Sequence, residues 1–319
     1  MSDTSPADLL AEARAGSRAA LARLITYVEH GGDRHRTTVA LAYASPVPYV
    51  VGITGPPGAG KSTLTNALVT RALEAGTFEG AHPFSKVAVL AIDPTSPFTG
   101  GAVLGDRVRM QSHSLDERVY IRSMATRGQL GGLSQAVPDA IRVLGAAGFE
   151  LVCVETVGVG QMEVEIASAA DTTLVVSIPG AGDAMQASKA GLLEIADVFV
   201  INKADRPDAH HVRRDLEAML DFVETSGWRP PIIETVALEA RGVAELWTSI
   251  ALHRRYLEES GQLTTQRELR AQVELERVMT SLLLERLRGR ATGDDFAAAV
   301  TRIVAGDIDP YRAAESLLP

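Results

Sequence analysis

The sequence has little of what defines several protein classes. Cys153 is the only cysteine among 319 residues, which excludes an intrachain disulfide and favours a reducing, cytoplasmic setting. The apolar runs are short and interrupted by glycine, proline or charge, so we expect no membrane span. An excess of basic residues is also missing. The formal net charge is −9, so we expect no general attraction to nucleic acid or to an anionic membrane.

From Tyr49 onward, short apolar runs rich in β-branched residues recur: Tyr49–Thr54, Val87–Asp93, Val119–Arg122, Leu151–Glu155, Thr173–Ile178, Val198–Asn202 and Ile232–Val236. Segments with helical patterns lie between several of them: Ser62–Ala75, Ser134–Ala147, Met162–Ala170, Ala184–Ile195, Ala209–Glu224 and Val243–Leu257. The runs lack the alternation of half-exposed strands, which indicates a parallel sheet covered on both faces. We therefore predict a doubly wound, mainly parallel α/β domain whose ligands bind beyond the carboxyl ends of the strands.

The residues before this region have a helical pattern. Apolar residues recur at helical spacing from Ala7 to Val28, and the Gly31-Gly32 pair is expected to end this first helix. We therefore predict an N-terminal helical segment over residues 1–45 and a central domain over residues 46–260.

Strand patterns stop after Leu257. An amphipathic helix is expected over Gln266–Arg288, ended by Gly289, and Asp294–Leu318 is expected to add one or two helices. Residues 261–319 are thus predicted to form a C-terminal helical segment.

The first predicted strand leads into a phosphate-binding motif. The segment Gly55-Pro56-Pro57-Gly58-Ala59-Gly60-Lys61-Ser62 matches the P-loop pattern in full, between a predicted strand and a predicted helix. Gly58 and Gly60 allow backbone N–H groups to approach phosphate oxygens closely, and the helix directs its positive end at them. We expect Lys61 to bridge the β- and γ-phosphates, Ser62 to ligate Mg²⁺ and Thr63 to donate to the α-phosphate.

A second motif indicates which base is bound. Asn202-Lys203-Ala204-Asp205 ends a predicted strand and matches the guanine signature N-K-x-D. An ionised Asp205 accepts from both N1–H and N2–H₂ of guanine, whereas adenine would set a lone pair against it. The stem of Lys203 can lie over the ring, and Asn202 can brace neighbouring loops and meet the base edge. GTP and GDP are the predicted ligands. Backbone N–H groups of three further residues are expected near guanine O6: Val236, Ala237 and Leu238.

Carboxylates at two other strand ends are candidates for holding Mg²⁺. Asp93 and Glu155 each end a predicted strand, and Mg²⁺ requires carboxylates in or near its coordination shell. The alternative is that each caps a helix. Asp106, in a glycine-rich segment, is a further candidate carboxylate.

The same segments hold candidate catalytic residues. Arg107 or Arg109 could stabilise charge in the transition state, although a solvated surface position is an equal alternative. The backbone N–H of Gly158 could reach a γ-phosphate, and Gln161 could orient the attacking water.

Together these motifs resemble those of one family, the MeaB/ArgK-type P-loop GTPases, which includes the methylmalonic aciduria type A protein. The resemblance covers nearly the whole chain and is carried by Gly55–Thr63, Asp93-Pro94-Thr95-Ser96, Thr99-Gly100-Gly101 with Leu104-Gly105-Asp106, Thr126-Arg127-Gly128 with Leu130-Gly131-Gly132, Glu155–Gln161 and Asn202–Asp205. It implies a homodimeric, slow GTPase that serves as a chaperone for adenosylcobalamin-dependent methylmalonyl-CoA mutase, gating cofactor loading and protecting the enzyme. It also implies metal-site positions at Asp93, Asp106 and Glu155, and a switch around Pro179–Gly191 that contacts the mutase.

Three other functions stay open. A metallochaperone GTPase that inserts nickel or a similar ion would share the Glu-x-x-Gly variant at Glu155, although such proteins usually need Cys or His clusters. An ATP-dependent kinase linked to amino-acid transport is disfavoured by Asp205. The third is a non-enzymatic scaffold that binds a nucleotide and dimerises through Gln266–Arg288, a helix that could instead pack within its own chain.

Overall fold

A computed structural model describes residues 4–75, 84–94, 113, 115–126, 136–156, 162–180, 192–222, 227–291 and 294–317. The chain forms two compact units, Met1–Leu263 and Thr264–Pro319. The predicted division at residues 45 and 260 stays a prediction.

The first unit is built on one sheet of seven strands in the order β3-β2-β4-β1-β5-β6-β7, and every neighbouring pair is parallel. The strands are β1 (Tyr49–Thr54), β2 (Val87–Pro94), β3 (Val119–Thr126), β4 (Leu151–Thr156), β5 (Thr172–Ser177), β6 (Val198–Asn202) and β7 (Ile232–Thr235). Every residue of β1, β4, β5 and β6 is buried, as expected where helices cover both faces. The predicted doubly wound α/β class is confirmed.

Strand β3 differs most from its predicted bounds. It continues to Thr126 rather than ending at Arg122. The reason is backbone pairing: β3 pairs with β2 from Val119 to Thr126, and the last part of this ladder does not depend on an apolar side-chain pattern.

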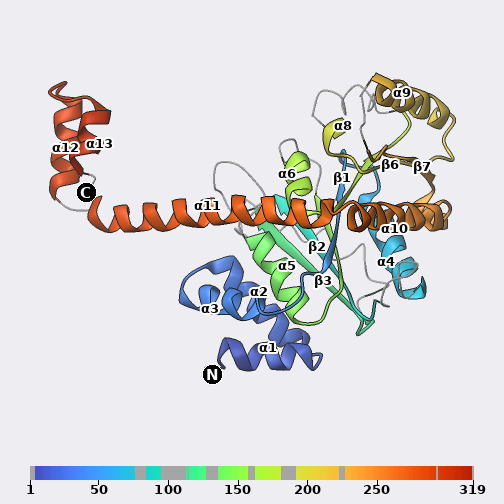
Figure 1. Cartoon of the computed structure of the whole chain (residues 1–319), viewed down its shortest axis with the longest axis horizontal. Coiled ribbons are helices and arrows are strands. Elements are labelled where there is room, and N and C mark those ends of the chain that lie inside the picture. The colour runs from blue at the N-terminus through green and yellow to red at the C-terminus, as the bar shows by residue number, and fades with distance from the viewer. Residues whose placement is uncertain are drawn as a thin grey trace. The chain divides into compact units, whose positions relative to one another are not determined.

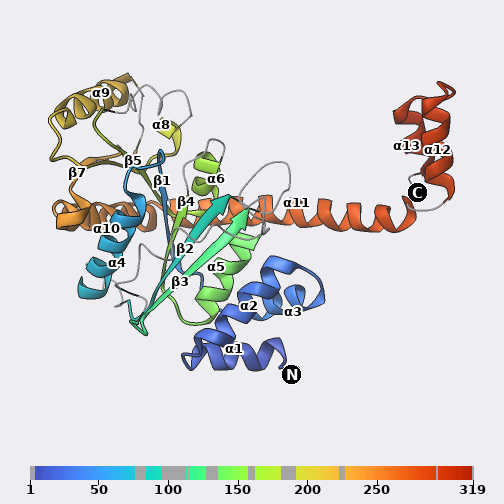
Figure 2. The ribbon, with the colours of Figure 1, turned by 180° about the vertical axis from the view of Figure 1, so that it is seen from behind.

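Helices cover the two faces of the sheet in separate groups (Figures 1 and 2). Helices α4 (Lys61–Ala75) and α10 (Val243–Glu259) share a core cluster with Val51 and Ile53 of β1. Val50, the residue before Val51, faces the opposite cluster, which contains residues of α5 (Ala136–Ala146) and α6 (Met162–Ala169). Helix α9 (Ala209–Phe222) packs on β6 in a third cluster, and the short helix α8 spans Leu192–Ile195.

The N-terminal region is helical as predicted, but its first helix is divided. Helices α1 (Pro6–Arg14), α2 (Arg18–His30) and α3 (Asp33–Ala42) join the core cluster of α5. The expectation of one helix up to the Gly31-Gly32 pair is wrong. Gly16 has φ +101°, and the Ser17 side chain caps α2 by accepting from Ala20 N–H.

A buried polar network lies where β1 and β5 begin, at the sheet edge opposite their carboxyl ends. The Tyr49 hydroxyl is 2.6 Å from Thr172 Oγ1, which is 2.9 Å from His253 Nδ1. His253 Nε2 is 3.3 Å from Asp197 Oδ1. Burial lowers the pKa of His253 to about 4, against the opposing effect of Asp171, so this imidazole is neutral at pH 7.

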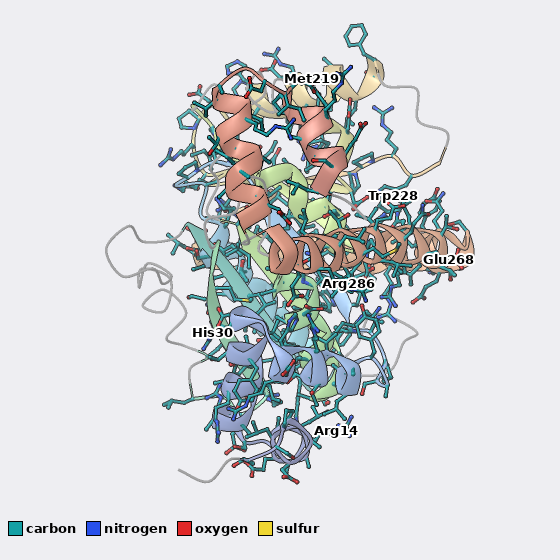
Figure 3. The ribbon with its side chains drawn as sticks, turned by 90° about the vertical axis from the view of Figure 1, so that its left-hand side faces the viewer. Arg14, His30, Met219, Trp228, Glu268 and Arg286 are labelled. Carbon is teal, nitrogen blue, oxygen red and sulfur yellow. The ribbon has the colours of Figure 1, made fainter. Side chains whose placement is uncertain are left out.

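Helix α11 (Gln262–Ala291) begins in the first unit and continues through the second. It passes Gly289, so the expectation that Gly289 ends it is wrong. One glycine near a helix end costs only about 1 kcal/mol relative to alanine. Figure 3 labels Glu268 and Arg286 on this helix, and α12 (Asp294–Val304) and α13 (Pro310–Leu317) lie side by side after it. The expected one or two helices after α11 are therefore two.

Candidate functional site

The P-loop connects β1 to α4, and its glycines are required by space as well as by backbone conformation. Gly55 has φ +139°, and a Cβ there would lie 2.1 Å from the Val176 carbonyl oxygen. Gly60 has φ +85°, and its Cβ would lie 2.5 Å from Asn202 Nδ2. The loop is therefore fitted closely against β5 and against the end of β6.

Lys61 is buried and is held by the loop that it follows. Its Nζ donates to the carbonyl oxygens of Gly55 at 2.7 Å and Pro56 at 2.9 Å. Helix α4 begins at this residue, so the N–H groups of its first turn and the positive end of its dipole face the loop. The loop, the ammonium group and the helix end together form a site suited to phosphate.

Glu155 of β4 lies against the start of α4, and two hydroxyl groups donate to its carboxylate. Ser62 Oγ donates to Oε1 at 2.6 Å, and Thr65 Oγ1 donates to Oε2 at 3.1 Å. All three residues are buried: Ser62 is 6% exposed, Glu155 is 4% exposed and Thr65 is 0% exposed. The structure thus brings together two of the four predicted metal-site residues, Ser62 and Glu155.

The other predicted metal and catalytic residues are described only in part. Asp93 lies near the end of β2, and the backbone pairing sets Ile92 beside Thr156. Asp93 and Glu155 therefore lie at the same edge of the sheet, where the strands have their carboxyl ends. Five predicted site residues lie outside the described residues: Asp106, Arg107, Arg109, Gly158 and Gln161. Their roles stay predictions, as does the predicted switch beyond Gly180.

The guanine signature is joined directly to the P-loop. Asn202 is buried, and its Nδ2 donates to the Ala59 carbonyl oxygen at 2.8 Å. Its Oδ1 accepts from Thr235 Oγ1 and from the Ala237 backbone N–H, each at 3.2 Å. Lys203 Nζ donates to the Gly58 carbonyl oxygen at 2.7 Å. The predicted bracing role of Asn202 agrees with these contacts.

Asp205 and the segment after β7 complete this part of the site. Asp205 is exposed, so a ligand could reach its carboxylate; its guanine-reading role stays a prediction. The backbone N–H of Ala237 is engaged with Asn202, and that of Val236 donates to the Arg241 carbonyl oxygen. The Leu238 side chain is 89% exposed. Contacts of these three residues with guanine O6 stay a prediction.

Thr65 is the residue of this site that the sequence analysis missed. It lies three residues after Ser62, so a helix places both hydroxyl groups on one face. That spacing was the available signal, but only the structure sets the Glu155 carboxylate opposite this face.

Cys153 lies two residues before Glu155 on the same strand. Burial, with a smaller effect of the Glu155 charge, raises the pKa of this thiol to about 12. The thiol is therefore neutral and unreactive at pH 7.

The described residues lack two further features, a cluster of metal-ligating side chains and a membrane-spanning helix. No three His, Cys, Asp or Glu side chains come close enough among them to hold a metal ion. None of the described helices combines the length and the hydropathy needed to cross a membrane.

Comparison with known proteins identifies the family of the chain. It is 47% identical to a putative GTPase of Pyrococcus abyssi over 98% of this chain and 95% of that protein. It is 30% identical to the mitochondrial methylmalonic aciduria type A homolog of Mus musculus over 95% of this chain and 76% of that protein. The crystal structure of a LAO/AO transport system kinase matches 99% of this chain and 97% of its own, with a TM-score of 0.71 and 27% identity. The sequence profile described as methylmalonyl Co-A mutase-associated GTPase MeaB matches residues 21–292, and the chain belongs to this family of guanine-nucleotide-binding P-loop proteins.

Proposed function

We propose that the chain binds and slowly hydrolyses GTP, and that this cycle assists adenosylcobalamin-dependent methylmalonyl-CoA mutase by gating cofactor loading and protecting the enzyme. One observation carries the nucleotide part of the proposal. The Asn202 amide bonds to the P-loop at Ala59, and the Lys203 ammonium bonds to it at Gly58. These bonds support the proposal because they hold the P-loop next to the segment that carries Asp205, the proposed guanine-reading residue.

The described residues divide the work on GTP among them. Backbone N–H groups of the P-loop and the Lys61 ammonium would bind the β- and γ-phosphates. Asp205 would select guanine by accepting from its two donors. Lys61 would also stabilise negative charge that develops on the phosphate oxygens in the transition state.

The donors near the P-loop fit Mg²⁺. The Ser62 hydroxyl and the Glu155 carboxylate are oxygen donors that already lie 2.6 Å apart, and Mg²⁺ prefers oxygen ligands. These two residues would hold it, with Asp93 and Asp106 as further proposed carboxylates. When bound, Mg²⁺ supplies positive charge that offsets the charge of the phosphates.

The mutase part of the proposal is supported by the family description and by the mouse relative, which is named for methylmalonic aciduria.

The C-terminal helical segment, and helix α11 in particular, is proposed to make a homodimer. Eight large apolar residues of α11 are at least 38% exposed: Leu269, Val273, Leu275, Val278, Met279, Leu282, Leu283 and Leu284. Exposed apolar residues in this number are typical of a helix that packs against another chain, and a second copy is the proposed partner.

Two measurements test these proposals. Calorimetry with GTP, GDP and ATP should show tight binding of the guanine nucleotides only, and Lys61→Ala should abolish triphosphate binding. Tighter binding of ATP than of GTP would contradict the nucleotide assignment.

The partner requires its own experiment. Untagged mutase should co-purify with the tagged chain in a manner that differs between GDP and a non-hydrolysable GTP analogue, and it should raise the rate of GTP hydrolysis. If the mutase neither binds nor stimulates the chain, the partner assignment fails while the GTPase assignment stands.

A further inference from the structure

The Thr65 hydroxyl faces two acceptors at once. Its Oγ1 lies 2.9 Å from the Lys61 carbonyl oxygen and 3.1 Å from Glu155 Oε2. A hydroxyl has one hydrogen, so a full bond goes to only one acceptor at a time. The carbonyl contact is the shorter of the two, whereas a bond to the carboxylate gains from its negative charge, so the two acceptors compete for the hydrogen.

We propose that Thr65 is a positioning residue that holds the Glu155 carboxylate in the orientation needed for the Mg²⁺ site; this inference rests on the proposed function. Ser62 is bonded to one carboxylate oxygen of Glu155, and the Ser62 hydroxyl is the group expected to turn to the metal. When it does so, Glu155 loses that donor. Thr65 keeps hold of the other oxygen, so the carboxylate does not rotate away.

The location of Thr65 suits this role. Thr65 is fully buried on the first turns of α4, and Glu155 is buried near the end of β4. Their bond therefore joins two rigid elements, the P-loop helix and the strand next to β1. A glutamate side chain has several rotatable bonds, and a second fixed contact removes most of that freedom before the metal arrives.

The test measures Mg²⁺ affinity rather than turnover. Fluorescence of N-methylanthraniloyl-GDP bound to the full chain is followed as Mg²⁺ is added, and in EDTA. In Thr65→Val, which keeps the shape and loses the hydroxyl, the Mg²⁺ concentration at half-saturation should rise by about 10- to 100-fold. Affinity for the nucleotide in EDTA should stay unchanged. Thr65→Ser should restore the Mg²⁺ response of the wild type.

A matched control is available in the same helix. Thr70 Oγ1 donates to the Asn66 carbonyl oxygen at 3.0 Å, the same four-residue contact that Thr65 makes with Lys61. Its second contact is with His113 Nε2, at 3.0 Å, rather than with Glu155, so Thr70→Val should leave Mg²⁺ affinity unchanged. If the Mg²⁺ concentration at half-saturation is unchanged in Thr65→Val, the positioning role is wrong. The role is also wrong if nucleotide affinity in EDTA falls by the same factor as Mg²⁺ affinity, because that result indicates a structural role alone. If the wild type binds no guanine nucleotide, the proposed function itself fails.

Discussion

Asn202 and Asp205 lie in the same four-residue motif but should respond to mutation in opposite ways. The Asn202 amide makes three buried hydrogen bonds, at 2.8, 3.2 and 3.2 Å. Asn202→Ala removes them and leaves the Ala59 carbonyl oxygen and the Ala237 N–H without these partners. At about 1 kcal/mol for each bond, with an added penalty for unsatisfied buried groups, we expect the free energy of unfolding to fall by about 3 kcal/mol. Asp205 is exposed, so Asp205→Asn should change it by less than about 0.5 kcal/mol.

The assay is urea denaturation without nucleotide, followed by circular dichroism, paired with nucleotide titrations. Asp205→Asn should keep its stability but shift preference from guanine toward xanthine, because the new amide presents a donor to the base. Asn202→Ala should lose both stability and affinity for every guanine nucleotide, since the same side chain holds the P-loop. A loss of less than about 1 kcal/mol in Asn202→Ala would refute the reasoning that this amide fastens the two loops together. Unchanged selectivity in Asp205→Asn would refute the base-reading role.

Three further predictions concern other parts of the chain. The His253 pKa is about 4 in the folded state and 6.5 in the reference state. Between these two pH values the unfolded chain therefore binds more protons than the folded chain. The free energy of unfolding should be highest above pH 6.5 and fall by up to about 3 kcal/mol as the pH drops toward 4. Urea denaturation across this range should show a smaller fall in His253→Gln, and equal curves for both proteins would contradict the buried neutral imidazole. Gly242 has φ +75°, and the Cβ of Gly242→Ala would lie 2.0 Å from the Glu234 carbonyl oxygen. At Gly148 φ is +90°, but nothing lies within 4 Å of the added Cβ. The unfolding temperature should therefore fall further in Gly242→Ala than in Gly148→Ala. Replacing Leu275 and Leu282 of α11 by Glu should reduce the gel-filtration mass from that of a dimer to that of the 33.9 kDa chain, whereas Glu276→Gln should not; a wild-type monomer would contradict the dimer proposal.

The sheet and the phosphate site could be predicted because local sequence determines them. Runs such as Tyr49–Thr54 are apolar at nearly every position since both faces of the strand are buried. The glycines of the P-loop are needed at fixed spacing by any backbone that must approach phosphate.

Features that depend on distant residues could not be predicted in this way. The Thr65 contact requires Glu155, ninety residues further along the chain. His253 is hidden in an amphipathic helix, and only packing against β5 gives it Thr172 as a partner. The break at Gly16 was missed because a single glycine within a helical pattern is often tolerated, and only the structure shows that the Ser17 side chain caps a new helix there.

The position of Lys61 has a consequence for how nucleotide enters. Its ammonium is bonded to the Gly55 and Pro56 carbonyl oxygens, so the chain supplies an internal competitor for the group that phosphate requires. Arrival of a ligand exchanges two existing bonds for new ones, which lowers the net gain in affinity. In the proposed GTPase cycle, the Lys61 ammonium would return to these two carbonyl oxygens when the product leaves, and the two bonds would then keep the loop in its present conformation.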